Sequence, residues 1–371
     1  METRSLDRCQ EWTREDGMTA DVLEIAFVVP ESGPSGIYGP SCTASGQLAI
    51  AELNATGGIL GREVRLRTVD GGRAPLVIAD EISRLVEAGA VDAVCGWHTS
   101  AVRQRLAPRL RGRIPYVYTA VYEGGEHTPG VFLTGETPTD QLLPAVRWMA
   151  EEMGVKSWVI VGNDYVWPRA SAATVQACAQ ELGIDIRGQT FVKLGTQDFG
   201  GVLRRVEQTR AQGVLMFLLG SDAVRFNRAF TEMRMHDHCI RLSSLMDENM
   251  LMATGAANTH DLYSAAGYFE TLGTAYGLDF ERRYLQHFGP QAPALTSPGE
   301  SCYEGISLFA QLATAARTTE VPRISTVADM ISYEGPRGAV RVRDQHLIQR
   351  IYLARADGLE FDVLAEIHAG A

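Results

Sequence analysis

Residues 158–168 read Trp-Val-Ile-Val-Gly-Asn-Asp-Tyr-Val-Trp-Pro. The first four residues form an apolar, largely β-branched run that is typical of a buried strand. Residues 162–164 then break the chain, and Pro168 suits the first turn of the helix predicted to follow. Tyr165 and Trp167 therefore fall in a loop at the carboxyl edge of a parallel sheet, where open α/β sheets bind small ligands. The two rings either line a ligand pocket or pack against the core and anchor the loop there.

Apolar strands alternate with amphipathic helices along the rest of the chain as well. The predicted strands before and after the opening stretch are residues 23–30, 63–69, 91–95, 114–118, 131–133, 185–192, 214–219, 240–243, 262–269, 335–343, 349–354 and 361–367. Such alternation is typical of parallel, doubly wound α/β sheets. Because 371 residues exceed what one core usually supports, two domains are expected.

The composition is that of an ordinary globular protein, with 45% hydrophobic and 21% charged residues. A formal net charge of −11 argues against a nucleic-acid-binding surface. The cysteines are scattered without a C-x-x-C pair, so isolated thiols are expected instead of a disulfide frame or a zinc site. Residues 1–20 are charged and lack the apolar segment of a secretory signal, and they are predicted to form a loose extension, in which Met18 is an alternative start. No apolar run is long enough to span a membrane, so a cytoplasmic protein is expected.

Catalytic and cofactor patterns are weak. The glycines at 33, 36 and 39 do not fit a phosphate-binding loop, and no G-x-S-x-G motif surrounds Ser100. The run His236-Asp237-His238 lies in a polar turn, where a solvated loop is expected and not a metal site. We therefore predict no enzyme activity, no metal and no cofactor.

Polar and aromatic side chains follow the predicted strands and would face a cleft between two α/β lobes. For each of them, a helix cap or a loop hydrogen bond is the alternative role. Thr99 and Ser100 also precede a helix, so their hydroxyls and the free N–H groups there suit a carbonyl oxygen of a ligand. These residues, which the sequence places after strand ends, are Thr99, Ser100, Thr119, Tyr165, Trp167, Ser221, Asp222 and Asp247.

Three stretches resemble a known family. Residues 51–62 read AELNATGGILGR, residues 118–124 read YTAVYEG and residues 162–169 read GNDYVWPR. With them the chain, from about residue 23 to 367, resembles the type I periplasmic-binding-protein superfamily. Within it, the sequence is most similar to the amide, urea and branched-chain amino acid branch, and above all to the amide receptors that negatively regulate aliphatic amidase operons.

The resemblance implies two doubly wound lobes joined by three crossovers, with the ligand closed between them. Residues 21–135 with 270–342 would form lobe one, and residues 136–269 with 343–371 would form lobe two. The residues matched one by one to the family's ligand site are His98, Ser100, Tyr118, Ala120, Val121, Tyr165, Trp167, Ser221, Asp222, Met246 and Asp247. Thr99 and Thr119, which follow strand ends, complete the predicted binding residues.

Several positions depart from the amide receptors, which carry a tyrosine where this chain has His98, a threonine at Ala120, a proline at Val121 and a second tyrosine at Trp167. Ala120 matters most, because a hydroxyl at this position in amino acid receptors helps to hold the α-ammonium group. No Arg or Lys lies in the predicted cleft loops. A small neutral amide is therefore the expected ligand.

Three functions compete at this stage. The first is a cytoplasmic amide sensor that controls a transcription regulator of amidase or nitrile-hydratase genes, with an antiterminator as a protein partner and a possible homo-oligomer. The second is the solute-binding subunit of an ABC importer for amides, urea or branched-chain amino acids. The third is an enzyme on a related fold, which the missing catalytic constellation disfavours.

Overall fold

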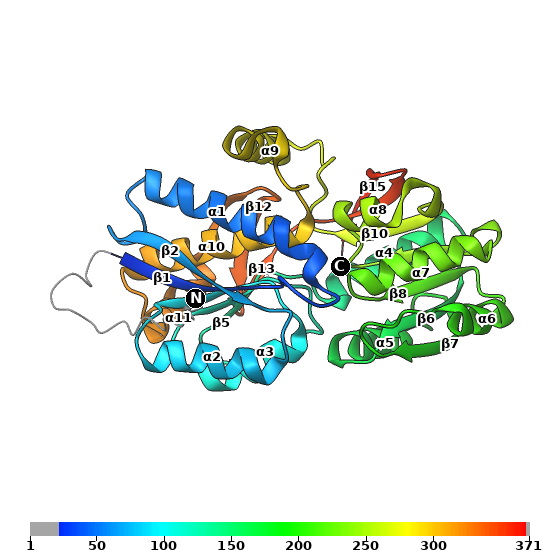
Figure 1. Ribbon diagram of the computed structural model, residues 1–371, viewed down its shortest axis with the longest axis horizontal. Coiled ribbons are helices and arrows are strands. Elements are labelled where there is room, and N and C mark those ends of the chain that lie inside the picture. Colours follow the sequence, from blue (N-terminus) through cyan, green and yellow to red (C-terminus); the bar gives the residue numbers. More distant parts are fainter. Residues whose placement is uncertain (1–21, 369–371) are drawn as a thin grey trace, which may run out of the picture.

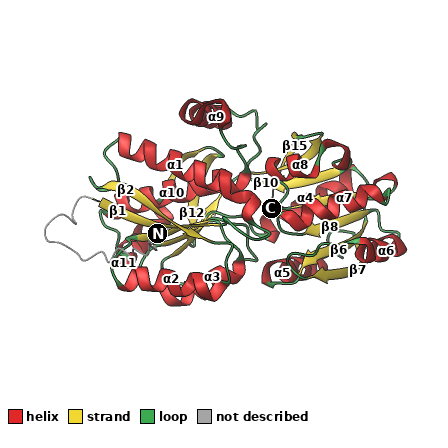
Figure 2. Ribbon diagram, viewed as in Figure 1, coloured by secondary structure: helices red, strands yellow, loops and turns green. Residues whose placement is uncertain are grey.

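The computed structural model describes residues 22–368 and places them in two α/β lobes (Figure 1). Each lobe is built on one sheet with helices on both faces (Figure 2). The loose extension predicted for residues 1–20 lies outside the described residues. Within residues 22–368, no helix combines the length and apolar composition needed to cross a bilayer.

The sheet of lobe one has eight strands in the order β11-β12-β13-β5-β4-β3-β1-β2. They are β1 (Val22–Val29), β2 (Glu63–Asp70), β3 (Ala93–Gly96), β4 (Tyr116–Tyr118), β5 (Val131–Leu133), β11 (Ser332–Gly335), β12 (Gly338–Arg343) and β13 (His346–Ile348). Strands β1 to β5 pair in parallel, and β13 continues this direction beside β5. β11 and β12 close the edge as an antiparallel hairpin.

The sheet of lobe two has seven strands in the order β15-β14-β10-β9-β8-β6-β7. They are β6 (Ser157–Asn163), β7 (Asp185–Val192), β8 (Gly213–Phe217), β9 (Ile240–Ser243), β10 (Leu262–Ala266), β14 (Ile351–Asp357) and β15 (Glu360–Ile367). Every residue of β6, β8 and β10 is buried. Helices on both faces explain why these strands read as continuous apolar runs and do not alternate with polar residues.

The helices follow the strands as the sequence predicts. Lobe one carries α1 (Gly39–Ala55), α2 (Pro75–Glu87), α3 (Ser100–Leu110), α9 (Ala275–Phe288), α10 (Ser297–Ala316) and α11 (Val321–Val327). Lobe two carries α4 (Pro138–Glu152), α5 (Val166–Cys178), α6 (Gly200–Thr209), α7 (Ser221–Glu232) and α8 (Glu248–Thr254). In Figure 1, α9 stands above α1 on the outside of the body.

The chain passes between the two sheets three times, after β5, after β10 and after β13. The predicted fold class, two doubly wound lobes with three crossovers, is therefore confirmed, with antiparallel strands added at one edge of each sheet. The predicted boundary at residue 342 falls too early, because β13 still pairs with β5 and β12 in the first sheet. The sequence missed β13 because only three residues form it.

The opening stretch folds with one difference from the prediction. Helix α5 begins at Val166, so Trp167 lies in its first turn and only Tyr165 stays in the loop, as the residue before the helix. Pro168 is accommodated because N–H groups in a first turn have no intrahelical acceptor.

Candidate functional site

A small, nearly closed cleft lies between the lobes, with a cavity volume of about 20 Å³. Its walls come from the loops after β3, β4, β9 and β10, from the first crossover and from the start of α10. The lining residues are Trp97, Thr119, Val121, Glu136, Ser244, Leu245, Met246, Asp247, Ala266, Ser297, Pro298 and Ser301. None of the side chains that line it is a lysine or an arginine.

The wall from lobe two is a loop held in place by its own hydrogen bonds. Ser243 Oγ, at the end of β9, accepts the N–H groups of Leu245 at 3.1 Å and Met246 at 3.2 Å. Ser264 Oγ, from β10, donates to the Met246 carbonyl at 2.8 Å. These bonds fix the backbone from which Ser244 and Asp247 project, so the wall is organised before any ligand arrives.

Asp247 is the N-cap of α8, and its Oδ1 accepts the Met250 N–H at 2.9 Å. Its Oδ2 is buried and has no hydrogen-bond donor among the described residues. Burial raises the pKa of Asp247 to about 7, against the opposing effect of the Met250 N–H. The Thr296 hydroxyl of lobe one lies close enough to lower the pKa of this carboxyl, although no hydrogen bond of regular geometry joins it to Oδ2, and it also contacts Ser41 Oγ at 3.0 Å. Asp247 Oδ2 can therefore accept a hydrogen bond from a ligand.

Ser244 lies three residues before Asp247 on the same wall of the cleft. Its hydroxyl is also buried without a hydrogen-bond partner within residues 22–368. An unpaired buried polar group costs free energy, on the order of 1–3 kcal/mol. Two such groups facing one cleft indicate a polar ligand that would complete their hydrogen bonds.

The wall from lobe one combines an aromatic ring with backbone polar groups. Trp97 follows β3, and its ring lies against the Tyr38 ring with centroids 4.5 Å apart. Thr119 follows β4, and its carbonyl accepts a hydrogen bond from Ser301 Oγ at 2.6 Å. Pro298 lies in the first turn of α10, so this helix turns its N-terminal end toward the cleft. An apolar wall and a helix N-terminus face the polar loop of lobe two.

The structure brings three of the sequence-predicted residues to this cleft: Thr119, Val121 and Asp247. Ala120 is buried next to them, with its carbonyl packed against Gly135. Thr99 is the N-cap of α3 and makes no side-chain cap hydrogen bond. As candidates for ligand contact these residues remain predictions.

His98, Ser100 and Tyr118 are buried inside lobe one. His98 Nε2 lies 3.0 Å from the Tyr116 hydroxyl, and the Tyr118 hydroxyl donates to the His98 carbonyl at 2.7 Å. Burial lowers the pKa of His98 to about 3, so its ring is neutral. Ser100 Oγ forms no hydrogen bond of regular geometry with the described residues, although Tyr118 is close enough to be affected by it. His98 and Tyr118 thus lie next in sequence to Trp97 and Thr119, which line the cleft, but are not themselves among its lining residues.

Tyr165 and Trp167 form a pair with ring centroids 6.3 Å apart. Trp167 packs onto Phe217 in an edge contact at 5.9 Å, which anchors the start of α5 to the core of lobe two. Burial, and after it Tyr118 of lobe one, raises the pKa of Tyr165, and Tyr165 is in turn among the groups that raise the pKa of Tyr38 in lobe one, after burial and Asp247. Of the two rings, Tyr165 is therefore the one that faces the other lobe.

Ser221 and Asp222 belong to the framework of lobe two. Asp222 Oδ2 accepts Asn163 Nδ2 at 2.8 Å and the Gly195 N–H at 2.9 Å, while Oδ1 accepts Arg225 at 3.2 Å. Ser221 Oγ also accepts Arg225 at 3.1 Å. The acceptors of Asp222 are thus engaged within lobe two, and neither side chain is among those that line the cleft, so both remain predictions as ligand contacts. The strand-end position places them at the right edge of the sheet but does not reveal which partners they meet.

The sequence analysis missed several cleft residues. Trp97 lies directly before His98, and its place at the end of β3 was an available signal. Ser297 and Ser301 belong to the start of α10, where Thr296 caps the helix and Pro298 occupies its first turn. Ser244 gave no signal, because a single serine after a strand is most often a turn residue.

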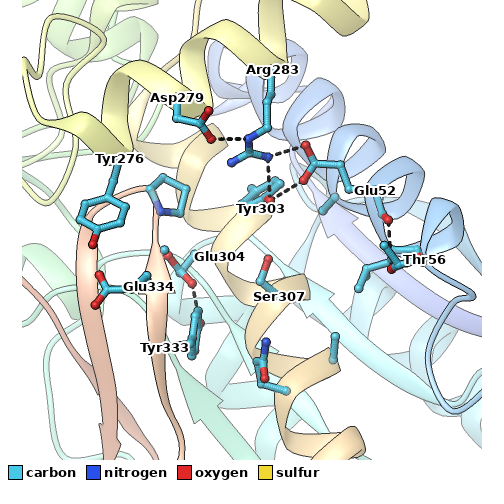
Figure 3. A pocket seen from close by; sticks show the side chains of 16 residues that line it. Glu52, Thr56, Tyr276, Asp279, Arg283, Tyr303, Glu304, Ser307, Tyr333 and Glu334 are labelled. Atoms are coloured by element: carbon cyan, nitrogen blue, oxygen red, sulfur yellow. Dashed lines mark hydrogen bonds and ion pairs between the residues drawn. The ribbon is translucent and has the colours of Figure 1, made fainter.

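A larger cavity lies on the outer side of lobe one, between α1, α9, α10 and the β11–β12 turn (Figure 3). Most of its charged groups are engaged in ion pairs or hydrogen bonds. Arg283 contacts both Glu52 and Asp279, and the Tyr303 hydroxyl donates to Glu52 at 2.5 Å. The Tyr333 hydroxyl donates to Glu304.

The buried Glu304 carboxyl also interacts with Glu300. Burial raises the pKa of both groups, that of Glu300 to about 8, so one proton between them supplies the missing donor. Glu304 Oε2 is nevertheless buried without a hydrogen-bond partner of regular geometry among the described residues, so the outer cavity differs from the cleft mainly in the ion pairs and tyrosine hydroxyls that engage its other carboxylates. Among the described residues, no group of three or more His, Cys, Asp and Glu side chains is placed to hold a metal ion.

The family profile described as periplasmic binding protein matches residues 22–360. The chain belongs to the periplasmic binding protein family. A Leu/Ile/Val-binding protein homolog 6 from Brucella melitensis is 25% identical over 352 residues, which cover 91% of this chain and 89% of that protein. The members of this family are ligand-binding proteins, and the similarity extends over both lobes.

Two solved structures have the same fold. The branched-chain amino acid transporter substrate-binding protein LivJ from Streptococcus pneumoniae, in complex with isoleucine, has a TM-score of 0.81 at 17% identity and covers 94% of this chain and 99% of its own. A solute-binding protein of an ABC transporter from Rhodopseudomonas palustris, in complex with 3,4-dihydroxybenzoic acid, has a TM-score of 0.82 at 18% identity, with 95% and 98% covered.

These similarities correct two expectations. The predicted cytoplasmic location is wrong, because the family is one of periplasmic proteins and the similar proteins are named as substrate-binding proteins of transporters. The charged residues 1–20 were therefore a misleading guide. The resemblance to the superfamily is confirmed, whereas the narrower resemblance to amide receptors that regulate transcription is not found in these relatives.

Proposed function

We propose that this periplasmic binding protein family member is the solute-binding subunit of an ABC importer, and that it closes on a small solute carrying an N–H-rich group. One observation carries the proposal: Asp247 Oδ2 and Ser244 Oγ are buried on one wall of the interlobe cleft without partners among the described residues. A carboxylate there needs a donor, and an ammonium or amide group supplies one.

A small amino acid is the first candidate. Its ammonium group would pair with Asp247, and its carboxylate would meet N–H groups at the start of α10, since a helix N-terminus favours anions. The apolar part would lie on Trp97 and Val121. The relatives named as Leu/Ile/Val-binding and the isoleucine-bound neighbour agree with this solute class.

A neutral amide is the second candidate, and Ala120 is the observation that favours it. Ala120 offers no hydroxyl to an ammonium group, and Thr119 turns its own hydroxyl toward Cys302 Sγ, 3.6 Å away. An amide would need only an acceptor for its NH₂ group, which Asp247 provides in its ionised form.

Calorimetry at several pH values distinguishes the two candidates. An ammonium group binds only ionised Asp247, so isoleucine binding at pH 7 should release protons, and affinity should rise as pH increases through the raised pKa of about 7. A protonated Asp247 can still donate to the carbonyl of butyramide, so its affinity should change little over this range. If none of leucine, isoleucine, alanine, butyramide or urea raises the melting temperature, the proposed solute class is contradicted.

Uptake by the native host tests the importer role. Deletion of the gene should lower uptake of the solute that stabilises the purified protein most. Unchanged uptake at limiting solute concentration would contradict the importer proposal even if the protein binds that solute.

A further inference from the structure

A short segment of lobe one, residues 34–38, crosses to lobe two and touches it outside the cleft lining. It includes a single 3₁₀ turn, Gly36–Tyr38, between β1 and α1. The loop before it is tied to lobe one by Asp70, at the end of β2. Asp70 accepts the Glu31 N–H at 2.9 Å and the Ser32 hydroxyl at 2.6 Å. The segment therefore moves as part of lobe one.

Its contacts with lobe two are backbone hydrogen bonds at the start of α7. The Ser221 N–H donates to the Pro34 carbonyl at 3.0 Å, and the Gly220 N–H donates to the Tyr38 hydroxyl at 3.0 Å. The first N–H groups of a helix have no acceptor within the helix. Lobe one supplies these acceptors. If the lobes opened, the N–H groups of Gly220 and Ser221 would lose them and form hydrogen bonds with water instead.

The hydroxyl of Tyr38 also has acceptors on lobe two. Met250 Sδ lies 3.2 Å away and the Leu245 carbonyl 3.5 Å away. The Tyr38 ring packs on Trp97, which lines the cleft. Tyr38 thus contacts lobe two and the rear of a cleft wall at once, although it does not itself line the cleft.

Gly220 permits the close approach. Its φ of +45° is strained for any other residue, and a Cβ there would lie 2.1 Å from the Pro34 carbonyl oxygen. A methyl group at this position would force the segment and α7 apart. The absence of a side chain at Gly220 therefore leaves the space that the Pro34 carbonyl occupies.

We propose that residues 34–38 are an interlobe latch, with Tyr38 as a positioning residue, which favours closed lobes without touching the solute. Its effect on solute affinity rests on the proposed function, whereas its effect on lobe closure does not. If only closed lobes bind tightly, the apparent dissociation constant is the intrinsic one divided by the closed fraction. Weakening the latch then weakens binding, although every solute contact is intact.

Three variants test the latch. Tyr38→Phe keeps the ring on Trp97 but removes the hydroxyl, and Gly220→Ala forces the contact apart. Tyr303→Phe is the matched control, because it removes a tyrosine hydroxyl bonded only within lobe one. Each variant is examined by small-angle scattering without added solute and by calorimetry with isoleucine, after melting has shown that it folds.

Both latch variants should have a larger radius of gyration than the wild type, while Tyr303→Phe should not. The isoleucine dissociation constant should rise about 3- to 10-fold in Tyr38→Phe and at least as much in Gly220→Ala. Unchanged scattering and affinity in both latch variants would overturn the proposal. If the wild type does not bind isoleucine, that result counts against the solute class, and the scattering of the variants still decides whether the latch exists.

Discussion

The interlobe cleft and the outer cavity beneath α9 are both lined by carboxylates, tyrosines and serines, yet they differ in how those groups are satisfied. In the outer cavity, Arg283 pairs with Glu52 and Asp279, and tyrosine hydroxyls donate to Glu52 and Glu304, which leaves only Glu304 Oε2 as a buried lining carboxylate oxygen without a partner among the described residues (Figure 3). In the cleft, Asp247 Oδ2 and Ser244 Oγ are left without partners among the described residues. A larger opening is therefore a poorer indicator of binding than unsatisfied polar groups.

The difference follows from where the residues come from. The outer cavity is built from elements of one lobe, which fold together and can satisfy one another. The cleft lies between two lobes. A polar group that is buried on the wall of one lobe can find its hydrogen-bond partner on a ligand bound between them. Burying such a group without a partner destabilises the empty site, and a ligand that forms the missing hydrogen bond removes this cost and so gains affinity.

The largest effect is expected for Asp247→Ala. Removing one partner of a buried charge pair costs about 2–5 kcal/mol, so the affinity for the solute found by thermal shift should fall at least 30-fold by calorimetry. Asp279→Ala, in the outer cavity, is the matched control and should bind as the wild type does. An equal loss in both variants would remove the distinction between the two regions.

The next effect is on stability and its pH dependence. The pKa of Asp247 is raised in the folded state, so the folded protein binds more protons than the unfolded chain, and stability from this group falls as pH increases from about 4 to about 7. Asp247→Asn keeps the α8 cap but removes the charge.

The free energy of unfolding of this variant should exceed that of the wild type by roughly 2–4 kcal/mol at pH 8 and differ little at pH 4. Urea denaturation at both pH values measures it. A variant equally stable to the wild type at pH 8 would show that Asp247 is not held in a costly ionised state.

Tyr165→Ala should weaken solute binding by about tenfold, because the ring faces lobe one and its removal costs roughly 1–3 kcal/mol of packing and hydrogen bonding. Leu285→Ala, on the exposed side of α9, provides a surface control that should leave affinity unchanged. Normal affinity in a folded Tyr165→Ala protein would remove this residue from the predicted site.

The smallest effect is expected in the outer cavity. Glu52→Gln removes a half-buried charge from the Arg283 network, and such pairs contribute about 0–1 kcal/mol. The melting temperature should fall by no more than a few degrees, and solute affinity should stay within a factor of two. If the Glu52→Gln variant bound the solute more weakly and the Asp247→Ala variant did not, the outer cavity would be the binding site and not the cleft.

The fold could be predicted because it depends on local patterns. The run of residues 158–161 and its counterparts in β8 and β10 are buried on both faces and so read as continuous apolar segments, and Pro168 indicates the start of α5. Strand β13 escaped because three residues are too few for a periodic pattern.

The candidate site could be predicted only in part. Position after a strand end placed Thr119 and Asp247 at the cleft, and the family resemblance added Val121. The strand-end rule also selected Asp222, whose acceptors are engaged by Asn163 and Gly195. Whether a carboxylate is free or paired depends on residues distant in sequence. No local pattern contains that information.

The central claim is that the interlobe cleft, and not the larger outer cavity, binds the solute. A crystal structure of the protein with the solute that gives the largest thermal shift tests it most directly. We predict density between Trp97 and Asp247, with an N–H donor of the solute within hydrogen-bonding distance of Asp247 Oδ2. Density beside Arg283 and Tyr333 in the outer cavity, with the interlobe cleft unoccupied, would contradict the account.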